Sequence, residues 1–182
     1  MKIFLSLSIL IILLIGCASQ DPLELTKATV EERDENVSGP NEIQLKSLNY
    51  EFVLKNNSKK TIGGMEKLRE DSYSYEDGIE LSIEPSEKLV KILEETIGFN
   101  FFEDNGQGGL GRGTATNPFI DPNQIGVYNF HFDLGAIEVN DEIQLAPTQE
   151  EMDRLVENAL EATLVVRVEN EEIARFDLTK WK

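Results

Sequence analysis

Cysteine and histidine are nearly absent from this chain of 182 residues. The only cysteine is Cys17 and the only histidine is His131. One cysteine cannot form an intramolecular disulfide or a multi-cysteine metal cage, and one histidine excludes any site that needs two imidazole ligands. The folded part must therefore be stabilised by its core.

Basic residues are also scarce. The sequence has 17 lysines and arginines against 34 aspartates and glutamates, a formal net charge of −17. Such an acidic surface repels phosphates and anionic lipid headgroups. The composition therefore argues against nucleic-acid binding and against docking to a membrane through a polybasic patch.

Assembled catalytic motifs are missing as well. Residues 106–111 match G-x-G-x-x-G, but no helix opens promptly after them and no βαβ unit surrounds them, so nucleotide binding is not expected. His131 and Asp133 lie two apart on a predicted strand and share one face. A general base also needs a nucleophile or an activated water, and the sequence identifies neither. We therefore expect a non-catalytic protein.

The amino terminus is the most informative segment that is present. Lys2 precedes an apolar stretch from Ile3 to Ile15, which ends in Leu14-Ile15-Gly16-Cys17. A positive start, a short apolar stretch and a small residue at its end are typical of a secretory signal, and the stretch is too short to span a bilayer comfortably.

The last four residues of this segment resemble the lipobox of bacterial lipoproteins. That resemblance implies cleavage between Gly16 and Cys17, a diacylglycerol group on the Cys17 sulfur and an N-acyl lipid on the new amine. It implies a protein anchored by lipid to the extracytoplasmic face of the cell membrane. In an organism with two membranes it implies the outer membrane, because Ala18 and Ser19 follow the cysteine in place of an aspartate. No cofactor beyond these lipids is expected.

Composition divides the chain into three parts. Residues 1–16 are predicted to be the signal peptide, 17–42 the lipidated cysteine with a flexible acidic tether, and 43–182 one folded domain. Residues 18–42 mix charged residues, serine, asparagine and proline with few apolar side chains. Such a segment cannot bury enough apolar surface to offset the entropy cost of ordering it.

Alternating apolar residues predict strands over 48–54, 79–83 and 127–134 and a terminal hairpin over 162–178. The alternation changes phase between Leu45 and Leu48, which predicts a bulge near Lys46–Ser47. Two helices are predicted, one capped by Ser86 and stopped by Gly98, the other opened by a capping box from Thr148 to Glu151.

Short strands without βαβ alternation, together with two brief helices, predict a mainly β fold, an antiparallel sandwich. The strand-and-turn opening near Asn56-Asn57-Ser58 and the terminal hairpin resemble the immunoglobulin-like modules of exported bacterial lipoproteins. The resemblance implies an immunoglobulin-like sandwich, although the paired cysteines of true immunoglobulin domains are absent.

A glycine-rich segment over 103–126 is predicted to be the longest loop, and Glu103–Asn123 within it is the best candidate region for contacting a ligand, because loops often carry binding residues. A plain surface loop is the alternative, and calcium binding by acidic residues at 103–121 or 71–77 is a third possibility. Phe99, Phe101 and Phe102 either fill the core or form a partner-binding patch. The candidate binding residues are Asp104, Asn105, Arg112, Phe119 and Asp121.

Together these features predict a membrane-anchored, extracytoplasmic binding or scaffolding module of the cell envelope. Its partners would be the membrane, reached through the anchor, and an envelope protein. Two alternatives stay open. One is a hydrolase of envelope polymers that uses carboxylates in the 71–77 and 103–121 segments. The other is an accessory or inhibitory subunit of an envelope complex.

Overall fold

The computed structural model describes residues 21–37, 43–103, 110–139, 141 and 143–182. The predicted signal peptide, Gly16, Cys17, Asp104 and Asn105 lie outside the described residues. No helix among the described residues is long and apolar enough to cross a membrane.

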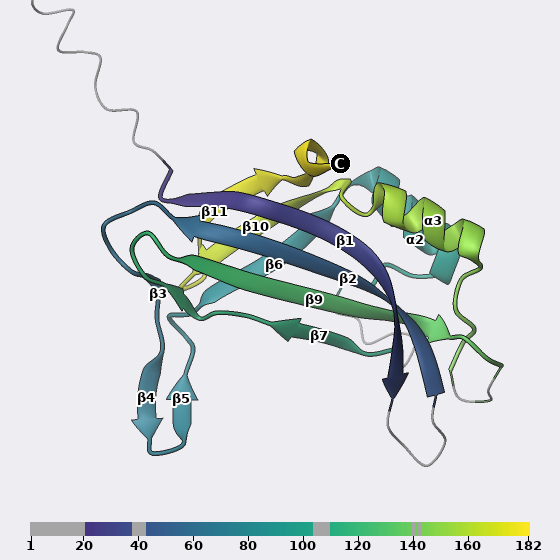
Figure 1. Ribbon diagram of the computed structural model, residues 1–182, viewed down its shortest axis with the longest axis horizontal. Coiled ribbons are helices and arrows are strands. Elements are labelled where there is room, and N and C mark those ends of the chain that lie inside the picture. Colours follow the sequence, from purple (N-terminus) through teal and green to yellow (C-terminus); the bar gives the residue numbers. More distant parts are fainter. Residues whose placement is uncertain (1–20, 38–42, 104–109, 140, 142) are drawn as a thin grey trace, which may run out of the picture.

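Two antiparallel sheets and two helices enclose one core, which confirms the predicted mainly β, sandwich-like fold (Figure 1). The four-stranded sheet has the order β1 (Leu23–Val37), β2 (Ile43–Asn56), β9 (Ile125–Ala136), β7 (Arg112–Ala115). The three-stranded sheet has the order β11 (Glu171–Asp177), β10 (Ala162–Val168), β6 (Ile79–Pro85). The chain ends in a short 3₁₀ helix, Leu178–Trp181.

Two further strand pairs lie at one end of the long sheet. The first joins β3 (Ile62–Gly63) to β8 (Phe119–Ile120), and the second is a small hairpin of β4 (Glu66–Arg69) and β5 (Ser72–Ser74). Figure 1 shows this hairpin projecting from the body of the protein. The strands β7 and β8 occupy part of the segment that we predicted to be one long loop, so that prediction was wrong for residues 112–115 and 119–120.

The helix α2 (Glu87–Ile97) begins and ends where its capping signals predict, and α3 (Gln149–Asn158) begins directly after the first residue of the predicted capping box. The Ser86 side chain accepts a hydrogen bond from the Leu89 N–H, and Gly98 ends α2 with a φ of 86°. Thr148 and Glu151 form the predicted capping box. The two helices contact each other and lie over the part of the long sheet that the shorter sheet leaves uncovered (Figure 1).

Aromatic rings fill the centre of the core. The Tyr50 ring centroid lies 5.9 Å from that of Phe52 and 5.9 Å from that of Phe132, and the Phe101 ring stacks on Phe132 at 4.3 Å. Phe101 is buried, and Phe99 and Phe102 pack against the same cluster. Phe101 is therefore a core residue, whereas Phe99 and Phe102 are only partly buried at the edge of the core.

The predicted tether is wrong for most of its length. Residues 23–37 form β1, a 15-residue strand paired with β2 from Leu23↔Asn56 to Val37↔Ile43. Leu23, Leu25 and Ala28 are buried in the common core. The folded domain thus includes β1, which starts twenty residues before the predicted start at Ile43.

Irregular alternation hid this strand. The register between β1 and β2 shifts between Leu25 and Lys27. The apolar residues therefore fall on odd positions at 23 and 25 but on even positions at 28 and 30. The later half of β1 is polar and makes ion pairs with β2, among them Lys46 with Glu32 and Asp34. Neither half shows the simple period of two that identifies a strand from sequence.

The bulge predicted near Lys46–Ser47 is confirmed. The pairing of β2 with β9 shifts register between these two residues. The shift allows Leu45 and Leu48 both to be buried although their spacing does not fit a regular strand. It also places Ser47 on the same face as Asp133, its partner across the ladder.

Gly63 fixes the base of the projecting hairpin and gives a test of this fold. Its φ is +73°, and an added Cβ would lie 2.4 Å from the Pro118 carbonyl oxygen. Gly98 has a similar φ of +86° but open space around it. We expect Gly98→Ala to cost about 1–2 kcal/mol of unfolding free energy for the left-handed backbone alone. We expect Gly63→Ala to cost about 1–3 kcal/mol more, from overpacking against backbone.

Urea unfolding of both variants measures this difference. Equal losses for Gly63→Ala and Gly98→Ala would contradict the close approach of the Pro118 carbonyl to Gly63.

Candidate functional site

The outer face of the four-stranded sheet carries a cluster of three ionisable side chains. Glu35 comes from β1, and His131 and Asp133 come from β9. One ligand atom from each lies within 4.8 Å of the others, and His131 Nε2 is 3.8 Å from Asp133 Oδ1. The sequence predicts the shared face of His131 and Asp133 correctly. It misses Glu35 because that residue falls in the segment predicted to be a tether.

Neighbouring polar groups hold the two carboxylates in place. Ser47 is fully buried, and its hydroxyl donates to Glu35 Oε1 at 3.2 Å and accepts from Asn49 Nδ2 at 2.8 Å. On the other side, the Gly111 N–H donates to Asp133 Oδ2 at 3.1 Å. Asp133 Oδ1 is thereby left facing the imidazole.

Two glycines of the glycine-rich segment make room for this cluster. A Cβ at Gly111 would lie 2.5 Å from Asp133 Oδ2, and a Cβ at Gly113 would lie 2.4 Å from His131 Cε1. The Asp133 carboxylate and the imidazole ring therefore lie directly against the backbone around β7. This close approach explains glycine at both positions in physical terms.

The surroundings of Asp133 shift the pKa of its carboxyl group upward. Burial raises the pKa of the Asp133 carboxyl above its ordinary value, and the charge of Glu35 adds to the rise. The charge of His131 and the hydrogen bond from Gly111 oppose it. One imidazole nitrogen and two carboxylates are a ligand set that divalent metals accept.

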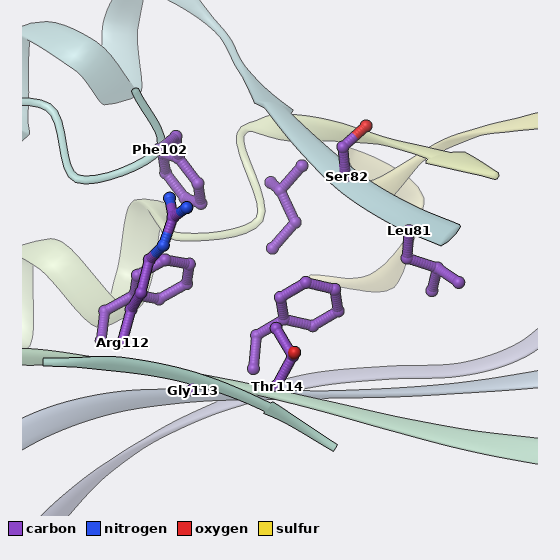
Figure 2. A pocket seen from close by; sticks show the side chains of 9 residues that line it. Leu81, Ser82, Phe102, Arg112, Gly113 and Thr114 are labelled. Carbon is purple, nitrogen blue, oxygen red and sulfur yellow. The ribbon is translucent and has the colours of Figure 1, made fainter. Parts of the chain in front are cut away.

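A pocket lies on the opposite side of β7, between the edges of the two sheets (Figure 2). Its volume is about 350 Å³. Phe102, Phe130 and Phe132 form its apolar floor, and β6 and β7 form its two sides. Figure 2 shows Arg112 reaching from β7 toward Phe102, with Thr114 beside it and with Leu81 and Ser82 across the opening. We call this the edge pocket.

The candidate binding residues do not form one site. Arg112 lines the edge pocket, whereas Phe119 lines a separate shallow hollow of about 510 Å³ with Met65 and Tyr75. Asp121 accepts a hydrogen bond from the Thr61 hydroxyl at 2.7 Å, which ties the two chain segments around β3 and β8 together.

The acidic residues suggested for calcium binding or hydrolysis also lie apart. Asp71, Glu76 and Asp77 are exposed in or beside the projecting hairpin. Among the described residues, the only carboxylates brought together with a third metal-binding group are Glu35 and Asp133.

Comparison with known proteins does not assign the chain to a family. No protein-family model, no curated protein sequence and no solved structure matches the chain.

The contact between Gly113 and His131 can be tested directly because the chain has a single histidine. In Gly113→Ala the new Cβ occupies the space of the imidazole, so the ring must swing outward, away from Asp133. We expect a clear change in the imidazole NMR signals. We expect little loss of stability, since the ring is partly exposed and can move.

Gly64→Ala is the matched control, because its Cβ would meet only an ordinary contact at 3.5 Å. Unchanged imidazole signals in Gly113→Ala would show that the ring does not rest on β7.

Proposed function

We propose that this protein is a lipid-anchored binding module of a bacterial cell envelope, and that it binds an extended segment of a partner protein in the edge pocket. The anchor rests on the resemblance of Leu14-Ile15-Gly16-Cys17 to a lipobox. The binding role rests on one observation, the aromatic-floored pocket between two sheet edges.

The strands beside this pocket support an extended ligand. β6 and β7 are the outermost strands of their sheets in the part of the chain that the structure describes. An extended peptide can add to an outer strand of a sheet through main-chain hydrogen bonds. The phenylalanine floor offers apolar contact to alternate side chains of such a peptide.

The anchor supports a binding role because it confines the module to the membrane surface. Each buried methylene of an acyl chain contributes roughly 0.8 kcal/mol, so two or three chains hold a protein essentially permanently. Confinement raises the local concentration of the module around envelope partners, so that even a binding site of modest affinity is occupied.

The anchor is tested by Cys17→Ala. Removing the sulfur removes the site of lipid attachment, so we expect the variant to fold but to leave the membrane fraction for the aqueous fraction. Ser19→Ala, which keeps the four lipobox residues, is the control and should stay with the membrane. Retention of Cys17→Ala in the membrane fraction would contradict the anchor.

The edge pocket is tested by two neighbouring positions on β7. Thr114 pairs with Phe130 and lines the pocket, whereas Ala115 pairs with Asn129 and faces the other side of the sheet. A photo-reactive amino acid at 114, in intact cells of the native host, should give one discrete adduct with a partner protein. The same amino acid at 115 should not.

Equal cross-linking from positions 114 and 115, or none from 114, would contradict binding in the edge pocket. Fractionation of the same cells tests the anchor separately, so that failure of the anchor and failure of the binding site can be told apart.

A further inference from the structure

Exposed apolar side chains gather at one end of the sandwich. Of the nine large apolar side chains that are exposed among the described residues, seven lie at the end that carries the small strand pairs and the start of β9. The chief members are Met65, Leu68, Tyr73, Tyr75, Phe119 and Ile125. The other two, Val139 and Leu145, follow the far end of β9. We call the first set the hairpin end.

The hairpin end also contains the start of β1, the first described strand. Leu23 of β1 pairs with Asn56 at the end of β2. The neighbouring residue of β2, Lys55, pairs with Ile125 of β9. The Asn57 N–H donates to the Pro22 carbonyl at 2.9 Å. In Figure 1 the start of β1, the pair β3–β8 and the projecting hairpin all lie at the left of the molecule.

The chain between the anchor and the domain is short. Cys17 precedes Asp21 by four residues, and four residues span at most about 14 Å even when fully extended. The two ends of the sandwich are much further apart, since the 12 residues of β9 alone span about 40 Å. A lipid on Cys17 therefore holds the hairpin end within reach of the bilayer, whereas the linker is too short to reach the far end.

The side chains of the hairpin suit the boundary between headgroups and acyl chains. Tyr73 and Tyr75 have an apolar ring with a polar tip, the amphipathic form that is enriched at this depth. Leu68 lies at the bulge of the hairpin, where the register shifts between Lys67 and Arg69. Met65, Tyr75 and Phe119 line the shallow hollow beside it.

Charge does not drive this contact. Lys67 and Arg69 are accompanied in the hairpin segment by Glu66, Glu70 and Asp71, which gives no net positive charge. The contact must therefore be apolar, and it needs no anionic lipid.

We propose that the hairpin end rests on the lipid bilayer, with Leu68, Tyr73 and Tyr75 inserted at the headgroup level. This inference rests on the proposed lipid anchor at Cys17. It fixes the orientation of the domain, with the polar end of β1 and the start of α3 directed away from the membrane.

Single tryptophans can report this orientation. Trp181 is the only tryptophan of the chain, so a Trp181→Phe variant has no tryptophan fluorescence of its own. Leu68→Trp and Leu145→Trp form a matched pair, because the two leucines are 56% and 55% exposed at opposite ends of the sandwich. Each mature chain, beginning at Cys17, is anchored to phosphatidylcholine vesicles that contain brominated lipid, a short-range quencher of tryptophan fluorescence.

The anchoring can be done in two ways. Natively lipidated protein is reconstituted directly, and unlipidated protein is coupled to a maleimide lipid through Cys17, the only thiol. The second preparation gives the same geometry whether or not cells lipidate the protein. Its result therefore separates the orientation from the proposed anchor.

The expected result is a blue shift of the emission and loss of most of it for Leu68→Trp, with Leu145→Trp unaffected. The loss should persist in high salt, because the contact is apolar. An unquenched Leu68→Trp, or stronger quenching at Leu145→Trp, would overturn the proposal. Replacement of Tyr73 and Tyr75 by serine should reduce the quenching at position 68, and no reduction would show that the tyrosines do not contact lipid.

Discussion

The pairing of β1 with β2 is the constraint on which the rest of the structure depends. It runs from Leu23↔Asn56 to Val37↔Ile43 and buries Leu23, Leu25 and Ala28 in the common core. Without β1, one side of β2 would be an open edge of unpaired main-chain groups. The same pairing places Glu35 beside His131 and Asp133, and it brings the start of the domain close to Cys17.

Bulges let this long sheet serve two purposes. The shifts at Thr26 and at Lys46–Ser47 allow apolar side chains to enter the core over one part of the strands. Beyond the core, β1 and β2 continue as a polar ladder, in which Lys46 pairs with Glu32 and Asp34. The ion pairs with exposed partners contribute little each, so this part of the sheet depends on main-chain pairing.

Local sequence signals predicted the regular elements well. The caps at Ser86 and Thr148, the alternation from Val127 to Leu134 and the terminal hairpin each rest on neighbouring residues, and each is confirmed. The phase change before Leu48 predicted a bulge for the same reason. The segment before Ile43 was misjudged because its alternation breaks at Thr26 and its second half is charged.

The candidate sites depend on contacts between residues that are far apart in the sequence, which no short stretch of sequence reveals. The Glu35 side chain meets His131 across β2, and Gly113 lies under the imidazole only because β7 pairs with β9. The edge pocket needs β6 and β7 to face each other from separate sheets. Sequence pattern selected Arg112 and Phe119, but only the strand order assigns them to different surfaces.

Backbone amide hydrogen exchange over Leu23–Val37 tests the central claim most directly, because β1 and a tether differ completely in protection. We expect slow exchange at the alternate amides of β1 that pair with β2, with protection near that of β2 itself. Exchange at unfolded-chain rates throughout this segment would contradict it. The start of the domain, the Glu35 contact and the orientation at the membrane would then all be withdrawn.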